Sequence, residues 1–327
     1  MPPQVPPPQA PPPQFPPAPH SAPTPGPAGY PAYPSHYLPL RDQRRKQRSQ
    51  QNVRLGCGLL LGLLILGLLC LASGAVVALF VAPVKANILV LGIDRVPEGT
   101  TTGRSDTLVL MRVDSSQPRI TTLAIPRDLW VKIPGYGENR INTAHFFAEA
   151  AQPGSGPAAA MQAVQANFAV PVQYYLRLRL EYVPGLVDAI GGVTVTLPKD
   201  MGGLTAGTHN LDGKAALAFV RDRKGTDDFF RMEQGQVFIK ATAQQLLNPL
   251  TWPRLPLIYA AFWKAVDTNL SIWQLANIGM TVVRLGPAKI ESHVLPREAA
   301  PPTTINGASV LLPRWDLIKP LIDQLFR

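Results

Sequence analysis

In the part of the chain after residue 83, arginine and aspartate recur in short blocks beside apolar segments. The blocks are Leu91-Gly92-Ile93-Asp94, Gly103-Arg104-Ser105-Asp106-Thr107, Ile125-Pro126-Arg127-Asp128, Val220-Arg221-Asp222-Arg223 and Asp227-Asp228-Phe229-Phe230-Arg231. Clustered guanidiniums can grip diphosphate oxygens bidentately, and paired carboxylates can hold Mg²⁺, the hard cation that usually accompanies such groups. The blocks therefore predict a binding site for a pyrophosphate ester.

Asp94 and Asp106 are the predicted metal ligands. Asp94 ends one predicted strand and Asp106 begins the next, so the loop between the strands can fold the two carboxylates together. Like charges in proximity raise each other's pKa or recruit a metal, and Mg²⁺ typically takes one or two carboxylates with water and phosphate oxygens. The structural alternative is an Asp94 cap and a surface ion pair with Arg104.

Four arginines are the predicted phosphate ligands. Arg127 follows Ile-Pro, and because proline biases the preceding residue toward extended backbone, its guanidinium is expected to project from the loop after a strand, where ligands often bind. Arg221 and Arg223 follow a predicted helix, where cations also offset the helix dipole. The dipole explains one of them, whereas the pair together with Arg104 and Arg127 indicates phosphate binding.

Asp228 has two possible roles. It precedes a predicted helix that begins near Arg231, and Asp is a good N-cap residue. If its carboxylate faces the diphosphate site, it can instead accept a proton from an attacking hydroxyl, which demands hydrogen-bond reach more than a special pKa.

Other sites have little support in the sequence. Asn142, just after Arg140, is expected to cap a helix rather than bind phosphate. His145, His209 and His293 are scattered without the spacing of zinc ligands. Neither a Gly-x-Ser-x-Gly elbow nor a Walker loop occurs.

Apolar periodicity and turn-forming residues predict the elements that must position these residues. The predicted strands are 86–93, 107–113, 119–125, 171–180 and 192–197, and the predicted helices are 142–151, 157–168, 182–190, 212–220, 231–247, 253–265, 271–284 and 310–326. Because strands and helices are mixed along the chain, we expect an α/β domain with a central mixed sheet flanked by helices, an αβα layered fold. The aromatic segment 248–273 is expected to pack in the core, with a lipid groove or a membrane interface as the alternative.

The first part of the chain has a different composition. Residues 1–40 hold 17 of the 36 prolines, which predicts a disordered, partly polyproline II tail that acts as a spacer or binds a cytoplasmic partner. Residues 55–82 are uncharged and long enough for one transmembrane helix. The basic residues before them predict that 1–54 is cytoplasmic and that 83–327 is an extracytoplasmic domain. A cleaved signal peptide is the alternative, but the apolar run and the preceding tail are too long for it.

Charge and cysteine content exclude some classes of function. Of 31 basic and 21 acidic residues, segment 1–54 holds six and one, which leaves 25 against 20 for the remainder. This modest excess argues against nucleic-acid binding by the outer domain. Cys57 and Cys70 both lie in the predicted span, so the outer domain has no thiol for a disulfide or a soft metal.

Four motifs, in this order after one predicted membrane helix, resemble the LytR-CpsA-Psr family, whose members attach glycopolymers to the bacterial cell wall. The motifs are Gly103-Arg104-Ser105-Asp106-Thr107, Ile125-Pro126-Arg127-Asp128, Gly191-Gly192-Val193 and Leu-Asp-Gly-Lys-Ala-Ala-Leu-Ala-Phe-Val-Arg-Asp-Arg at 211–223. The resemblance covers residues 86–247. Each motif alone is weak, whereas a chance match to all of them is improbable.

The resemblance implies an extracytoplasmic α/β domain that binds a polyprenyl pyrophosphate-linked glycan, with the lipid in a hydrophobic pocket and Mg²⁺ at the head group. It implies a phosphotransferase that moves the glycopolymer to a hydroxyl of peptidoglycan and forms a phosphodiester. By position, Asp94 and Asp106 would hold the metal, and Asp228 and Arg127 would be catalytic. The implied pyrophosphate ligands are Arg104, Arg127, Arg221, Arg223, Arg231, Gln234 and Gln236.

One segment departs from the family pattern. The family usually continues Asp-Phe-Gly-Arg with Arg-Gln-Gln, whereas this chain has Phe230 in place of glycine and Gly235 where glutamine is expected. A phosphate contact would then be lost, or it would be taken over by Gln234 or Gln236. The departure keeps two rival functions open: a polyprenyl-pyrophosphate-binding carrier or envelope sensor without chemistry, and a polyprenyl-pyrophosphate hydrolase.

Overall fold

The computed structural model describes residues 40–81, 83–94, 103–222 and 228–327. The chain divides into two units, Met1–Leu68 and Leu69–Arg327, and each is described by itself.

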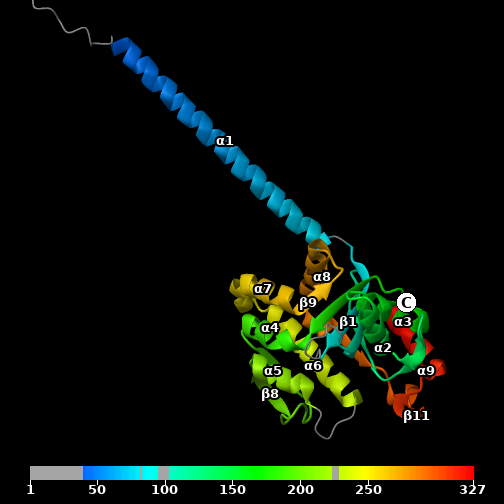
Figure 1. Cartoon of the computed structure of the whole chain (residues 1–327). Helices are drawn as coiled ribbons and strands as arrows, with labels where there is room; N and C mark the ends of the chain where they lie inside the picture. Colours follow the sequence, from blue (N-terminus) through cyan, green and yellow to red (C-terminus); the bar gives the residue numbers. More distant parts are fainter. Residues whose placement is uncertain (1–39, 82, 95–102, 223–227) are drawn as a thin grey trace, which may run out of the picture. The chain divides into compact units, whose positions relative to one another are not determined.

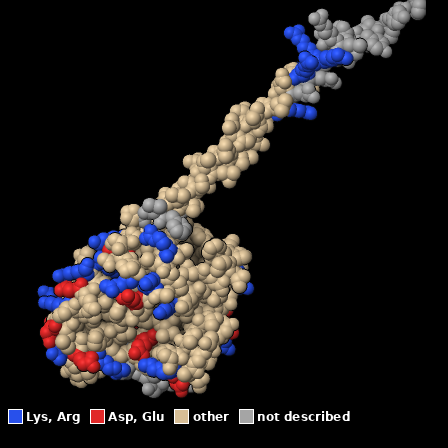
Figure 2. All heavy atoms as spheres, turned by 180° about the vertical axis from the view of Figure 1, so that it is seen from behind, with Lys and Arg blue, Asp and Glu red and all other residues tan. Residues whose placement is uncertain are grey.

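Helix α1 (Leu40–Val81) supplies the described residues of the first unit and continues into the second. Its segment Arg44–Ala78 has a mean hydropathy of 2.6 and is long and apolar enough to cross a membrane, by length and composition. Figure 2 shows this stretch as a tan rod with basic side chains at its N-terminal end. The helix begins before the predicted start at residue 55, because the preceding segment is rich in Arg and Gln, which favour helix.

The second unit is built on a mixed six-stranded sheet of order β10-β3-β2-β1-β6-β9. Its strands are β1 (Lys85–Ile93), β2 (Ser105–Asp114), β3 (Ile120–Ile125), β6 (Tyr174–Arg179), β9 (Val266–Thr268) and β10 (Ile290–Val294). β1 pairs antiparallel with β2 and parallel with β6, and β3 pairs antiparallel with β2 and parallel with β10. The predicted central mixed sheet is confirmed.

Helices cover both faces of this sheet (Figure 1). Because alternate side chains of a strand point to opposite faces, Leu89 and Leu91 of β1 belong to one core cluster and Ile88 belongs to another. The first cluster packs against α2 (Thr143–Ala151), α3 (Gly156–Phe168) and α9 (Trp315–Phe326), and the second packs against α6 (Asp228–Leu247) and α8 (Ile272–Leu285). The layered arrangement of the predicted fold is therefore also confirmed.

A third apolar cluster lies beside α6 and joins α4 (Val183–Ile190), α5 (Gly213–Arg221) and the hairpin of β7 (Val193–Leu197) with β8 (Gly207–Leu211). The predicted strand 192–197 thus forms, but it pairs with β8 and lies outside the main sheet. Gly191 and Gly192 have φ of 97° and 92° at the C-terminus of α4, a conformation that favours glycine and accounts for the Gly-Gly pair.

The remaining elements are peripheral. They are the hairpins β4 (Trp130–Ile133) with β5 (Gly137–Arg140) and β11 (Pro302–Ile305) with β12 (Ala308–Leu311), helix α7 (Leu255–Ala265), and the 3₁₀ segments η1 (Leu180–Tyr182), η2 (Pro249–Arg254), η3 (Pro287–Lys289) and η4 (Arg297–Ala299). The predicted helix 310–326 begins late, at Trp315, because its first residues pair in β12.

The aromatic segment 248–273 differs from its prediction. Ile258 is buried, but Leu250 is 84% exposed and Leu257 is 64% exposed, as are Trp252, Tyr259 and others to a lesser degree. The expectation that this segment packs in the core is wrong for most of its large apolar side chains.

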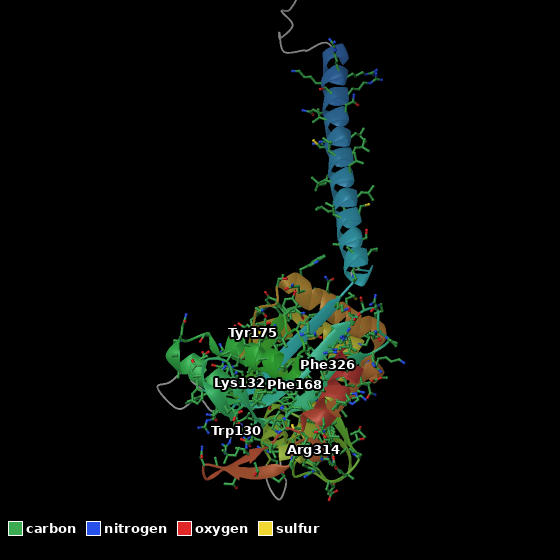
Figure 3. The ribbon with its side chains drawn as sticks, turned by 90° about the vertical axis from the view of Figure 1, so that its right-hand side faces the viewer. Trp130, Lys132, Phe168, Tyr175, Arg314 and Phe326 are labelled. Carbon is green, nitrogen blue, oxygen red and sulfur yellow. The ribbon has the colours of Figure 1, made fainter. Side chains whose placement is uncertain are left out.

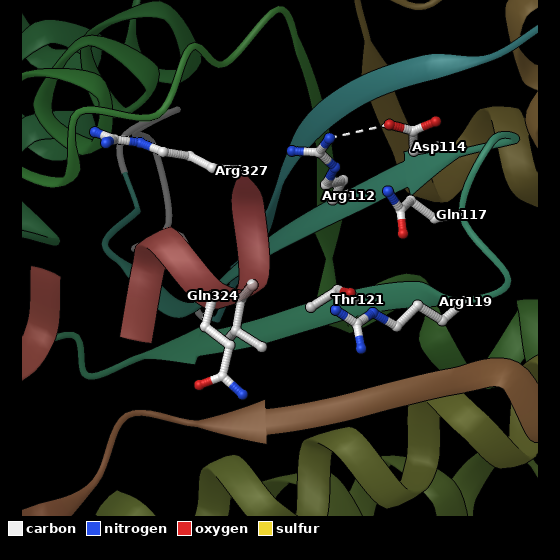
Figure 4. Close-up of a pocket in the computed structure, with 8 residues that line it drawn as sticks. Arg112, Asp114, Gln117, Arg119, Thr121, Gln324 and Arg327 are labelled. Atoms are coloured by element: carbon white, nitrogen blue, oxygen red, sulfur yellow. Dashed lines mark hydrogen bonds and ion pairs between the residues drawn. The ribbon is translucent and has the colours of Figure 1, made fainter. Parts of the chain in front are cut away.

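The far end of β2 fastens the C-terminal helix to the sheet (Figure 4). The buried Arg112 donates to the carbonyl oxygen of Phe326 through Nη1 and to Asp114 Oδ2, at 3.0 Å, through Nη2. Burial raises the pKa of Asp114, but hydrogen bonds from Ser116 and Arg112 outweigh burial and hold that pKa below its usual value. Arg112 and Asp114 therefore form a satisfied structural pair.

Candidate functional site

Three predicted site residues meet at one edge of the sheet because of strand register. Ile93 at the end of β1 pairs with Ser105 at the start of β2, so Asp94 and Asp106 lie at the same edge. In the next pair of strands Leu108 lies opposite Ile125. Arg127 follows Ile125 by two residues as Asp106 precedes Leu108 by two, which brings their side chains together.

Two aspartate–arginine pairs occupy this edge. Arg127 Nη1 lies 2.5 Å from Asp106 Oδ1. Arg221, at the end of α5, forms an ion pair through Nη2 with Asp94 Oδ1. Arg127 Nε also lies 3.5 Å from Asp128 Oδ2. Asp94 thus pairs with Arg221 instead of forming the surface pair with Arg104 considered from the sequence. The structure brings two of the predicted phosphate ligands onto the two predicted metal ligands.

The edge also carries polar atoms that have no hydrogen-bond partner among the described residues. The Nε of Arg221 is buried and, within the described part of the chain, has no hydrogen-bond partner. The same holds for Asn142 Oδ1, and Asn142 makes no side-chain capping bond to α2, so the capping expectation is wrong. Arg104 is exposed, with its guanidinium carbon 5.5 Å from the ring centroid of Phe146. Buried unpaired polar atoms in a native fold call for an explanation, and an absent ligand is one.

Backbone hydrogen bonds hold the loops of this edge together. The N–H of Asn142 donates to the carbonyl of Arg127 at 3.2 Å, and the N–H of Ile141 donates to the carbonyl of Leu129 at 2.8 Å. The Oγ of Ser105 lies 3.5 Å from the carbonyl oxygen of Asn142. The start of β2, the loop after β3 and the start of α2 are thus fixed to one another.

A buried polar cluster lies beneath the loop that carries Arg104. His145 Nδ1 lies 3.1 Å from the carbonyl oxygen of Gly103, and His145 Nε2 lies 3.4 Å from Arg177 Nη1. Since arginine can only donate, Nε2 accepts and Nδ1 carries the proton that it donates to Gly103. Arg177 also pairs with Glu149 at 3.1 Å and with Asp267 at 2.7 Å.

The electrostatics of this cluster agree with a neutral imidazole. Burial and the positive charge of Arg177 lower the pKa of His145. Burial raises the pKa of Glu149, but hydrogen bonds from the N–H groups of Gly154 and Gly156, together with Arg177, lower it further than burial raises it. Burial and Asp267 raise the pKa of Tyr175. The cluster thus contacts the backbone of Gly103 through a histidine whose neutral form is favoured.

Gln234 and Gln236 of α6 make hydrogen bonds within the fold. Gln234 is buried and donates through Nε2 to the carbonyl of Phe219, which ties α6 to the end of α5 next to Arg221. Gln236 is buried, accepts from Thr122 Oγ1 at 2.9 Å and lies 3.4 Å from the carbonyl of His293. These contacts fasten α6 to the sheet. The phosphate-binding role of both glutamines stays a prediction.

The other predicted site residues are Arg231, Asp228 and Arg223. Arg231 is partly buried in the first turns of α6. Asp228 begins α6, and its side chain, like the whole of Arg223, lies outside the described residues. Their roles stay predictions.

The donor set at the edge fits Mg²⁺ in one particular way. Among the described residues, no cluster of three or more His, Cys, Asp or Glu side chains is arranged to hold a metal. Mg²⁺ needs no such cage, because it usually keeps several waters and takes one or two carboxylates with phosphate oxygens of the substrate. Asp94 and Asp106, which pair with arginines in this structure, would be the two carboxylates that hold the cation.

The sequence prediction missed His145, Glu149 and Arg177 as supports of the site. One signal was available: His145 and Glu149 are spaced by four residues on an otherwise apolar helix, so they share one face. The unpaired Asn142 gave no signal, because an Asn before a helix is ordinarily a cap.

The sequence and the fold have counterparts among known proteins. The model of the LytR_cpsA_psr family matches residues 81–326. A protein of Oceanobacillus iheyensis named polyisoprenyl-teichoic acid–peptidoglycan teichoic acid transferase TagU is 33% identical over 198 residues, 59% of this chain and 61% of its own length. A Staphylococcus aureus protein named regulatory protein MsrR is 26% identical over 220 residues, 65% of this chain and 64% of its own length. The chain thus spans less than two thirds of each.

Solved structures share the fold. Bacillus subtilis TagV superposes with a TM-score of 0.62 at 21% identity, over 74% of this chain and 95% of TagV. TagT bound to LIIa-WTA superposes with a TM-score of 0.59 at 24% identity, over 74% of this chain and 89% of TagT.

Proposed function

The chain belongs to the LytR_cpsA_psr family, and from that premise we propose that it is a membrane-anchored phosphotransferase. The proposed donor is a glycopolymer on a polyprenyl pyrophosphate carrier, and the proposed acceptor is a hydroxyl of peptidoglycan. The name of the TagU relative, a teichoic acid transferase acting on peptidoglycan, supports this assignment. The observation that carries it is the meeting of Asp94, Asp106, Arg127 and Arg221 at one sheet edge.

The two ion pairs explain how a site of this kind stays folded without its ligands. In the free protein each aspartate neutralises one arginine. With substrate and Mg²⁺ bound, Asp94 and Asp106 would hold the cation, and Arg127 and Arg221 would bind the diphosphate. A divalent cation and a diphosphate diester cancel each other's charge, so the net charge of the site is conserved. This exchange favours binding of the two ligands together over binding of either alone.

The proposed reaction is an in-line displacement at phosphorus. The oxygen of the acceptor hydroxyl forms a bond to the glycan-linked phosphorus, and the bond from that phosphorus to the bridging oxygen breaks. Polyprenyl monophosphate leaves with the electron pair of the broken bond, and the hydroxyl proton passes to a base, for which Asp228 is the proposed residue. Arg127, Arg221 and Arg104 stabilise the charge on the leaving phosphate, and Mg²⁺ supplies further charge neutralisation when bound.

We also propose that α1 anchors the protein with its N-terminus in the cytoplasm. The basic residues of segment 41–54 precede the uncharged stretch, and the excess of Arg and Lys on one side of a span marks its cytoplasmic end. The domain that carries the site then lies outside, where peptidoglycan is accessible. Protease protection of residues 1–54 in sealed, right-side-out vesicles tests the orientation, and cleavage of that segment in intact vesicles contradicts it.

The transfer assay uses the full-length protein in detergent with a polyprenyl pyrophosphate-linked glycan, peptidoglycan and Mg²⁺. We expect a phosphodiester-linked product that disappears in Arg127→Ala and Arg221→Ala variants and when EDTA removes Mg²⁺. Absence of product with wild-type protein that binds the lipid contradicts the proposed reaction.

A second candidate function is a carrier or envelope sensor that binds the same lipid without chemistry. It is favoured by the name regulatory protein MsrR of one relative and by Phe230 and Gly235 at the start of α6. In the same assay, retained lipid without turnover selects the carrier. Release of phosphate without an acceptor product selects a hydrolase instead.

A further inference from the structure

Helix α8 is apolar on two adjacent faces. Its inner face packs Leu275, Ile278 and Val282 against the sheet. Ile272 and Val283 are exposed, and Ala276 and Gly279 between them continue the same exposed stripe at helical spacing. A helix of a soluble domain normally carries polar residues on the face that it leaves exposed. In α8 the described residues cover the first apolar face and leave the second exposed.

A second exposed apolar segment immediately precedes α8 in the chain. Leu255, Tyr259 and Trp263 repeat every four residues on α7, so they form one stripe, and all of them are exposed. Leu250, Trp252 and Leu257 extend it onto η2 and the neighbouring face of α7. We call the exposed apolar side chains of η2, α7 and α8 the apolar surface. Its members are Leu250, Trp252, Leu255, Leu257, Tyr259, Trp263, Ile272, Trp273, Ala276, Gly279 and Val283.

The composition of the apolar surface suits the boundary between lipid and water. It holds Trp252, Trp263 and Trp273, three of the five tryptophans of the chain, and Tyr259. Tryptophan and tyrosine are enriched at the level of lipid head groups, since their rings are apolar and carry one polar atom.

The charge around the apolar surface favours an anionic partner. Segment 249–289 contains four basic residues, Arg254, Lys264, Arg284 and Lys289, and one acidic residue, Asp267. The exposed Arg254 and Lys264 lie on the same segment as the stripe of α7. Basic residues beside an apolar face strengthen binding to anionic lipids.

Chain connectivity keeps the inner face of α8 close to the end of α1. Val84 belongs to the same core cluster as Leu275 and Ile278 on the inner face of α8. Helix α1 ends at Val81, three residues earlier, and an extended chain of that length reaches about 10 Å. If α1 spans the membrane, the cluster beneath α8 lies within that reach of the helix end.

We infer that the apolar surface docks into the outer interface of the lipid bilayer. The inference rests on the membrane anchor put forward under the proposed function, and not on the transfer reaction. Docking covers the outer stripe of α8, places the aromatic rings at head-group depth and sets the basic residues against lipid phosphates. It also holds the domain in a fixed orientation relative to the membrane that supplies the polyprenyl-linked donor.

The test uses tryptophan fluorescence of the full-length protein in vesicles of phosphatidylcholine and phosphatidylglycerol with brominated acyl chains, which quench nearby indole rings. We expect wild-type protein to lose most of its emission relative to vesicles without bromine. The triple variant Trp252→Phe, Trp263→Phe, Trp273→Phe is expected to lose little. The matched control is Trp130→Phe with Trp315→Phe. Trp315 packs on Phe168 in the core, Figure 3 shows Trp130 at the end of the domain away from the orange α8, and this control is expected to be quenched like wild type.

Flotation of the same vesicles separates the possible failures. Protein that floats with the vesicles but shows no quenching, or equal quenching in the triple variant, overturns the docking inference while α1 still anchors. Protein that does not float overturns the anchor and with it the docking. Unquenched emission together with a dimeric mass in detergent assigns the apolar surface to a second copy of the chain and also overturns the inference. Transfer activity is not part of any of these outcomes.

Discussion

Strand β2 carries an aspartate at each end, and each aspartate pairs with an arginine, yet the surroundings of the two pairs differ. Asp114 and Arg112 are 6% and 10% exposed, and the guanidinium is engaged by Asp114 and by the carbonyl of Phe326. Asp106 and Arg127 are each 21% exposed and lie beside the Asp94–Arg221 pair, in which Arg221 Nε lacks a partner among the described residues. The same two residue types thus form both pairs. Among the described residues, the pairs differ in whether protein groups complete the hydrogen bonds of the guanidinium groups.

The largest effect on stability is expected from Arg112→Ala. Removal of the arginine leaves Asp114 buried without its counter-charge and frees the end of α9, which costs about 3–5 kcal/mol. Thermal unfolding of the full-length protein in detergent measures it. The matched control is Arg119→Ala, since Arg119 pairs with Glu291 at the surface and is expected to contribute about 1 kcal/mol or less. Equal melting temperatures for the two variants would contradict a structural role of the Arg112–Asp114 pair.

The next effect concerns transfer. Arg127→Ala is expected to reduce the transfer rate about 100-fold or more, because it removes a donor to the charge that develops on the leaving phosphate. Its melting temperature should change far less than that of Arg112→Ala. Arg314→Ala, which removes an exposed arginine paired with Asp316, is the control and should transfer at the wild-type rate. A normal rate in Arg127→Ala contradicts the functional half of the comparison.

Sequence patterns predicted the ends of the strands at the site better than the pairing of distant side chains. The strand ends that hold Asp94, Asp106 and Arg127 were predictable, because β1, β2 and β3 are long apolar runs bounded by turn residues. The pairing of Asp94 with Arg221 was not, since it joins residues 127 positions apart through the packing of α5. Sequence separation of that size leaves no local signal.

The edge strand β9 and the hairpin strand β8 were not predicted from the sequence. β9 has three residues, and β8 reads Gly-Thr-His-Asn-Leu without apolar alternation, so neither has the periodicity that identifies a strand. Whether the strand at 193–197 joins the main sheet or a separate hairpin is also decided by tertiary packing. Helix α8 has the sequence of a core helix, because apolar periodicity does not show whether a second apolar face packs against protein or stays exposed.

Gly156→Ala tests whether the cluster under Arg104 belongs with the site. A Cβ at this position would lie 2.7 Å from Glu149 Oε2 and 2.8 Å from His145 Nε2, so the cluster must shift, at a cost of about 1–3 kcal/mol. Transfer should fall together with stability, because His145 positions the loop of Gly103. Gly185→Ala on α4, where a Cβ meets nothing within 4 Å, is the control and should keep both. A destabilised Gly156→Ala variant with the wild-type rate per folded molecule would separate the cluster from the site.

The smallest effect is a pH dependence of stability. The pKa of His145 is lowered in the folded protein, so below the ordinary histidine pKa of about 6.5 the unfolded chain binds a proton that the native state does not. Stability is therefore full above that pH and falls as pH falls through it. The pKa of Glu149 is also lowered, so its contribution is lost only at more acidic pH, below the ordinary range of a glutamate. Near pH 6, the melting temperature should change less steeply with pH in His145→Gln than in wild type or in the control His209→Gln. Equal slopes in all three would contradict a buried neutral His145.

The most direct test of the central claim is a crystal structure of the full-length protein with a polyprenyl pyrophosphate and Mg²⁺. We expect the diphosphate to lie at the sheet edge with Arg127 and Arg221 bound to its oxygens. Asp94 and Asp106 are expected to contact the cation instead of the arginines. Arg112 is expected to keep its hydrogen bonds to Asp114 and Phe326. A diphosphate bound elsewhere, with both aspartate–arginine pairs of the edge intact, would contradict the claim.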